Sequence, residues 1–167
     1  MNQPPWLRGP VDGIPALLQP VVHALVDADE DVTKVVRPLS AAQVNARPAG
    51  VASIAYHVTH AMGSLDRLFT YARNETLSEG QMAVLIAEKM RDLSTLSGAA
   101  LVGQFSAAVQ RAYAQLRATR DAELLETRLV GRGKLPSNTL GLLFHAAEHT
   151  ARHVGQIVTT AKVVASL

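Results

Sequence analysis

Three histidines recur at every fourth residue near the carboxyl-terminal end of the sequence: His145, His149 and His153. In an α-helix, residues four apart lie one above another on the same face, so this spacing predicts a helix over 144–157 that carries a stripe of imidazoles. Two neutral imidazoles one turn apart can chelate a divalent transition metal, and a third ligand from a neighbouring helix would leave one coordination position open. Three in-phase histidines in an otherwise apolar segment favour a metal site over a polar face paired with carboxylates.

The composition predicts close-packed helices in a single domain over 1–167. Hydrophobic residues make up 48% of the sequence, but aromatic residues make up only 4%. Ala, Val and Leu supply most of the apolar content, whereas a sheet would be richer in aromatic and β-branched residues. There is no cysteine, which excludes disulfides, thiolate-bound metals and a cysteine nucleophile, and fits a reducing compartment.

Charge and hydropathy patterns argue against nucleic-acid and membrane partners. The formal net charge is +2, and the sixteen Lys and Arg residues are dispersed along the chain rather than clustered. No apolar run is long enough to span a membrane and the amino terminus lacks a signal-peptide pattern, so we expect a cytoplasmic protein. The densest basic segment, 128–134, is predicted to be a solvated loop. The alternative is that Arg128, Arg132 and Lys134 attract an anionic substrate.

Apolar residues at three- and four-residue spacing predict four long helices and one short helix. The long helices are predicted over 16–36, 53–75, 97–118 and 138–165, and the short helix over 79–92. Residues 1–15 are rich in proline and should form an extended arm, with Trp6 packed on the body as an anchor. The segment 119–136 should be a long connection without a strand. The predicted fold class is therefore all-α, a four-helix bundle with an additional short helix.

The second predicted long helix contains two further histidines, His57 and His60, which lie beside its apolar stripe. Either could supply the third metal ligand, and the spacing alone does not choose between them. His23 lies between apolar positions of the first helix. We expect it to be a partly buried, hydrogen-bonded histidine of the core rather than a ligand.

Two passages resemble the DinB-like (DinB/YfiT) superfamily of metal-binding four-helix bundles, and the resemblance extends over nearly the whole chain. The passages are LSAAQVNARPAGVASIAYHVTHAMGSLDRL and EHTARHVGQI. In that family, one histidine of the second long helix and two of the last helix bind a divalent metal, often zinc or nickel. The resemblance implies His60, His149 and His153 as the ligands. It favours His60 over His57 because the family's histidine precedes a short apolar pair and a small polar stretch, as at 60–64. The role of His145 stays open.

The resemblance implies two classes of function. Some relatives resemble thiol transferases that use the metal to activate a low-molecular-weight thiol such as bacillithiol or mycothiol, and others are stress- or damage-induced proteins. We therefore expect either a metal-dependent thiol S-transferase or hydrolase acting on a small molecule, or a non-catalytic metal-binding stress- or damage-response protein. No catalytic residue is assigned, and Glu148, Asp66 and Gln156 are only loosely placed candidates for a general base.

We also expect a homodimer, because relatives are often dimeric and because the chain carries surplus apolar residues. After a four-helix core is filled, several apolar side chains still need cover: Trp6, Val158, Ala161, Val163 and Val164. A two-fold contact would bury them. The alternative is that the proline-rich arm covers them within one chain.

Overall fold

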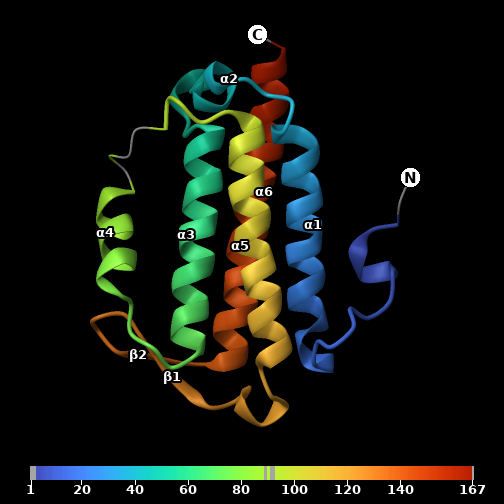
Figure 1. The fold of residues 1–167 in the computed structure, drawn as a ribbon, viewed down its shortest axis with the longest axis vertical. Helices are drawn as coiled ribbons and strands as arrows, with labels where there is room; N and C mark the ends of the chain where they lie inside the picture. Colours follow the sequence, from blue (N-terminus) through green and yellow to red (C-terminus); the bar gives the residue numbers. More distant parts are fainter. Residues whose placement is uncertain (1–2, 89, 91–92, 167) are drawn as a thin grey trace.

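Four long helices form a bundle in the computed structural model, which describes residues 3–88, 90 and 93–166 (Figure 1). The long helices are α1 (Gln19–Val36), α3 (Ile54–Ala72), α5 (Gly98–Ala118) and α6 (Thr139–Ala165). Both α5 and α6 pack against α1 and α3, so the helices surround one core. The predicted all-α bundle is confirmed.

Shorter elements cover the ends and one side of the bundle. The short α-helices are α2 (Ala41–Asn45) and α4 (Glu79–Ala87), and the 3-10 helices are η1 (Pro5–Leu7), η2 (Ala16–Leu18), η3 (Pro48–Gly50) and η4 (Asp121–Glu123). Helix α2 lies at one end of the bundle, whereas α4 lies alongside α3 (Figure 1). Among the residues that the structure describes, no helix combines the length and apolarity that a membrane span needs.

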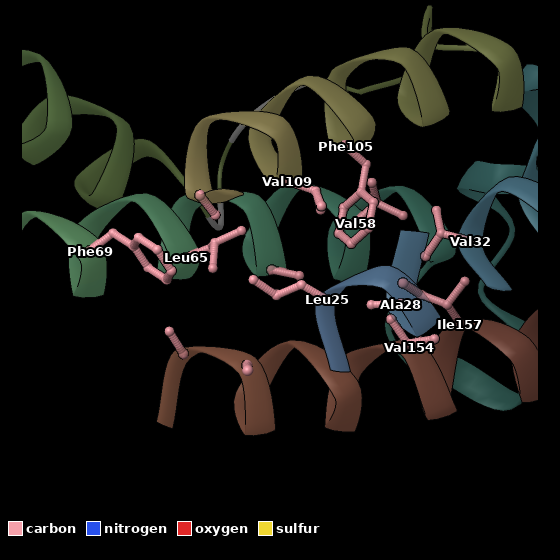
Figure 2. Close-up of a cluster of buried hydrophobic side chains, with 14 of the residues drawn as sticks. Leu25, Ala28, Val32, Val58, Leu65, Phe69, Phe105, Val109, Val154 and Ile157 are labelled. Carbon is pink, nitrogen blue, oxygen red and sulfur yellow. The ribbon is translucent and has the colours of Figure 1, made fainter. Parts of the chain in front are cut away.

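Apolar stripes on the four long helices meet in the core. Figure 2 shows side chains from all four helices converging, among them Leu25, Val58, Phe105 and Ile157, which are fully buried. Their three- and four-residue spacing on each helix is what puts them on one face. The regular burial of these stripes holds α3 and α6 in the alignment on which the histidine cluster depends.

Polar side chains cap the starts of two long helices. Ser53 accepts a hydrogen bond from the backbone N–H of Tyr56, and Asn138 accepts one from the N–H of Gly141 at 2.7 Å. Each cap satisfies one donor that the first turn of a helix leaves unpaired. Asn138 is therefore the N-cap of α6, which begins at Thr139.

Three predicted boundaries need correction. The first helix was expected from residue 16, but residues 16–18 form the 3-10 helix η2 and the α-helix begins at Gln19. The second helix ends at Ala72 rather than at 75, because Asn74 adopts a left-handed backbone conformation with φ of 62°. Helix α4 ends at Ala87 rather than at 92, and residues 89, 91 and 92 lie outside the described part of the chain.

The prediction of a strandless connection over 119–136 was wrong. Strands β1 (Thr127–Val130) and β2 (Leu135–Asn138) pair in antiparallel register as a hairpin. The basic segment is also not fully solvated, because Arg128 is only 7% exposed. Its Nε donates to the carbonyl oxygen of Ala72 at 2.9 Å, and this hydrogen bond connects the hairpin to the last turn of α3.

The amino-terminal arm packs against α1, but not through the predicted anchor. Trp6 is 66% exposed, so that prediction was wrong, and the neighbouring Pro5 is buried instead. The guanidinium of Arg8 bonds to the carboxylate of Glu30 on α1. His23 is partly buried and its Nε2 lies 3.0 Å from the carbonyl oxygen of Gly9, so the expected hydrogen-bonding partner is present.

Candidate metal centre

Helices α3 and α6 bring three histidines together near the first turns of α3. His60 comes from α3, whereas His149 and His153 come from α6 one turn apart. One ring nitrogen from each lies within 4.8 Å of the others. These are the three residues that the family resemblance implied as ligands, so the predicted convergence is present, while metal binding itself stays a prediction.

The spacing of the nitrogens fits a tetrahedral transition-metal site. The Nε2 atoms of His60 and His149 lie 3.1 Å apart. Two imidazole nitrogens bound to one tetrahedral zinc ion at about 2.0 Å would lie about 3.3 Å apart, so this pair needs an adjustment of only a few tenths of an ångström. The ring centroid of His153 lies 4.6 Å from those of both partners, which places all three rings around one point.

His57 is adjacent to this cluster and contacts the ring of His153. Its side chain is buried, and its Nδ1 lies 3.0 Å from Nδ1 of His153. One of the two nitrogens must carry the hydrogen, and if His153 donates it, then the Nε2 lone pair of His153 is free for a metal. A ligating histidine commonly uses its other ring nitrogen in this way. His57 therefore fits a supporting role, which the sequence spacing could not assign.

A second supporting contact comes from outside the two histidine helices. Glu88, at the carboxyl-terminal end of α4, places its Oε1 2.8 Å from Nδ1 of His60. Its Oε2 lies 3.6 Å from Nη2 of Arg67. Sequence reasoning missed Glu88 because 28 residues separate it from His60 and no spacing rule relates the two. No signal in a single sequence would have found it.

The carboxylates that the sequence suggested as candidate bases are engaged elsewhere. Glu148 accepts hydrogen bonds from its helical neighbour Arg152 at 2.6 Å. Asp66 accepts a hydrogen bond from the Nε2 of Gln81 at 2.7 Å. Both pairs are exposed, and each carboxylate is already hydrogen-bonded to a side chain outside the histidine cluster.

Burial favours the neutral, metal-binding form of His57, His149 and His153. Desolvation is the main cause that lowers the pKa of His57 and of His149, and the positive charge that His60 would carry lowers both further. Desolvation together with His60, His149 and His57 lowers the pKa of His153 to about 4. At neutral pH these rings are therefore uncharged, with a lone pair available for coordination.

His145 lies outside the cluster, although it belongs to the same helical stripe. Its side chain is 54% exposed and its Nδ1 lies 3.4 Å from the Glu148 carboxylate. Its ring centroid is 5.8 Å from that of His149, so it flanks the cluster on the surface. His145 is therefore not positioned to ligate a metal ion held by His60, His149 and His153.

A cavity of about 960 Å³ opens beside the cluster between the η3 segment and α6. His57 forms part of its wall, Arg152 and Gln156 contribute polar groups, and Val51 and Val163 contribute apolar surface. A mainly apolar pocket with few polar groups is typical of small-molecule sites.

The basic hairpin has no part in this cavity. Arg128 bonds to the carbonyl of Ala72, which is twelve residues beyond His60 on α3 and hence about 18 Å away along the helix. The idea that Arg128 attracts a substrate to the cluster therefore finds no support.

Comparisons with known proteins agree with this description. The sequence profile of the DinB superfamily matches residues 24–157, which include the whole histidine cluster. The chain is also similar in structure to a conserved protein from Enterococcus faecalis, with a TM-score of 0.70 and 17% sequence identity over 90% of this chain and 98% of that one. No curated protein matches it in sequence. The fold is thus shared with a solved structure, and the chain belongs to the DinB superfamily.

Proposed function

We propose that this protein binds a divalent transition metal through His60, His149 and His153 and presents an open coordination position to a small molecule. The observation that carries the proposal is the convergence of three ring nitrogens, from two helices, within 4.8 Å. We propose zinc or nickel, the ions that the family resemblance implies, since three imidazoles suit both and there is no cysteine to select softer ions.

The residues of the chain suit a reactive site better than a purely structural one. Three neutral imidazoles add no negative charge, and a divalent ion held by them would lower the pKa of a thiol or water at the open position. His57 and Glu88 hold the rings of His153 and His60 in place through hydrogen bonds. The open cavity beside His57 has room for a small molecule, and its lining is mainly apolar.

The reaction class that we propose is metal-dependent thiol S-transfer or hydrolysis, with bacillithiol or mycothiol as candidate thiol cofactors. The second candidate is a non-catalytic metal-binding protein of a stress or damage response. What favours the second is that Glu148 and Asp66 are bonded to other side chains, so neither is placed as a general base.

A thiol-transfer assay separates the two candidates. The purified zinc- or nickel-loaded protein is mixed with bacillithiol, mycothiol or glutathione and a chromogenic electrophile, and product is followed with and without chelator. The enzyme hypothesis expects turnover that chelator removes, that added metal restores and that the His149→Ala variant lacks. The His145→Ala variant, altered on the same stripe outside the cluster, should retain it. A metal-loaded protein that turns over none of the thiols and hydrolyses no ester would favour the non-catalytic role.

The two histidines of α3 should respond differently to substitution. We expect His60→Ala to lose stoichiometric zinc binding, because it removes one of only three ligands. We expect His57→Ala to keep one zinc per chain but with an affinity about 10- to 100-fold weaker, because it removes only the partner that orients His153. Competition titration against a chromophoric chelator measures both. Normal binding by His60→Ala together with loss in His57→Ala would show that the ligand assignment on α3 is wrong.

We also propose a homodimer, although fewer apolar side chains are exposed than the sequence predicted. Ala161 and Val164 are buried within one chain, whereas Trp6 is 66% and Val163 is 43% exposed. A two-fold contact between equivalent surfaces would cover the exposed pair. Light scattering at micromolar concentration should give twice the 17.8 kDa of one chain, and a mass near 17.8 kDa would exclude the dimer.

A further inference from the structure

Helix α4 is apolar in sequence but has no buried side chain among its residues, Glu79–Ala87. Val84, Leu85 and Ile86 are all exposed, by 49%, 37% and 73% respectively. A helix that buries so little apolar surface gains little from the hydrophobic effect. Polar contacts to α3 therefore add to the partial apolar cover that holds the helix in place.

Polar contacts from two residues, Gln81 and Glu88, connect the ends of this helix to α3. At the first turn, the Nε2 of Gln81 donates to Asp66 Oδ2 at 2.7 Å and to Thr70 Oγ1 at 2.8 Å. At the other end, Glu88 contacts His60. Of these two residues, only Glu88 contacts the candidate metal centre.

The Glu88 carboxylate is held firmly between two partners on α3. Its side chain is 11% exposed, the Arg67 side chain is 12% exposed, and the carboxylate spans from His60 Nδ1 to Arg67 Nη2. Gly63 provides the space for this arrangement, since a Cβ there would lie 2.8 Å from Arg67 Nη1 and 3.6 Å from Glu88 Oε1. Because the carboxylate accepts the Nδ1–H of His60, the lone pair of that ring is on Nε2, 3.1 Å from His149.

We propose that Glu88 is a positioning residue for the metal centre and that, through its bond to His60, metal occupancy and the docking of α4 stabilise each other. The proposal rests on the metal site proposed above. A carboxylate on the outer nitrogen of a ligating histidine fixes its tautomer and orientation and makes it a better donor. The coupling must be reciprocal: if docked α4 improves metal affinity, bound metal favours docked α4 by the same factor.

Zinc affinity tests the positioning role. Competition titration with a chromophoric chelator should give Glu88→Ala an affinity about 10- to 100-fold below that of the unaltered protein. Glu88→Gln should recover part of this loss, because its amide oxygen can still accept the Nδ1–H bond. Glu79→Ala is the matched control: it removes the same charge from an exposed position of the same helix and should bind zinc normally. Unchanged affinity in Glu88→Ala, or an equal loss in Glu79→Ala, would overturn the proposal.

Hydrogen exchange tests the coupling with a readout that does not depend on activity. Few buried contacts should let α4 open at low free energy, so its amides exchange readily without metal. Added zinc should slow their exchange in the unaltered protein and in Glu79→Ala, but much less in Glu88→Ala. Equal slowing in all three proteins would contradict the coupling. If the unaltered protein binds no zinc, both the metal site and this inference are refuted. If Glu88→Ala binds zinc as tightly as the unaltered protein, only this inference is refuted.

Discussion

Replacing either His149 or His153 by alanine is expected to abolish stoichiometric binding of zinc and nickel. The two residues form the two-ligand arm of the proposed site on one face of α6, so removing one leaves two imidazoles on different helices. Alanine is the best helix former, and both side chains lie at the edge of the core, so α6 should keep its fold. Elemental analysis after dialysis should find about one metal per chain in the unaltered protein and almost none in either variant.

The matched control for these variants is His145→Ala. It removes an imidazole from the same helical stripe, one turn before His149, but from a side chain that is 54% exposed and outside the cluster. Its metal content should equal that of the unaltered protein. Full metal retention by both cluster variants would refute the site. A loss in His145→Ala as large as theirs would show that metal binding also requires His145.

Gly98→Ala is expected to cause a large loss of fold stability although it adds only one methyl group. Gly98 starts α5 where it passes the end of α1, and its backbone N–H donates to the carbonyl of Leu39 at 3.0 Å. An added Cβ would lie 2.0 Å from the carbonyl oxygen of Val36 and 2.7 Å from that of Leu39. Both are backbone atoms that cannot rotate away, so the helices must separate. We expect a loss of about 3 kcal/mol in the free energy of unfolding.

Gly103→Ala provides the control on the same helix. A Cβ at this position meets nothing within 4 Å, and alanine is favoured over glycine inside a helix by about 0.5–1 kcal/mol. Chemical denaturation should therefore move the midpoint upwards for Gly103→Ala and downwards for Gly98→Ala. Equal stability of the two variants would mean that α5 does not approach α1 as closely as described.

The long helices could be predicted because their signal is local. Leu101, Phe105 and Val109 repeat at four-residue spacing on α5, and all three are fully buried. The hairpin could not be predicted in the same way. Each of its strands has only four residues, Pro136 interrupts the second, and the intervening glycines are typical of a loop. The β-structure of this segment arises from hydrogen bonding between the two strands, which a periodic pattern of apolar residues does not reveal.

The candidate site was predictable only in part. The four-residue spacing of His149 and His153 showed their shared face, and the family resemblance singled out His60. The roles of His57 and Glu88 depend on contacts between residues 96 and 28 positions apart in the sequence, which no local pattern records. The burial of Arg128 has the same origin, since its partner Ala72 lies 56 residues away.

X-ray absorption spectroscopy of the unaltered protein loaded with one equivalent of zinc tests the central proposal most directly. The proposed site predicts three imidazole nitrogens at about 2.0–2.1 Å and one further light ligand, with the multiple-scattering pattern of imidazole rings. A first shell made only of oxygen atoms, or zinc that is lost on gel filtration, would contradict a metal centre built from His60, His149 and His153.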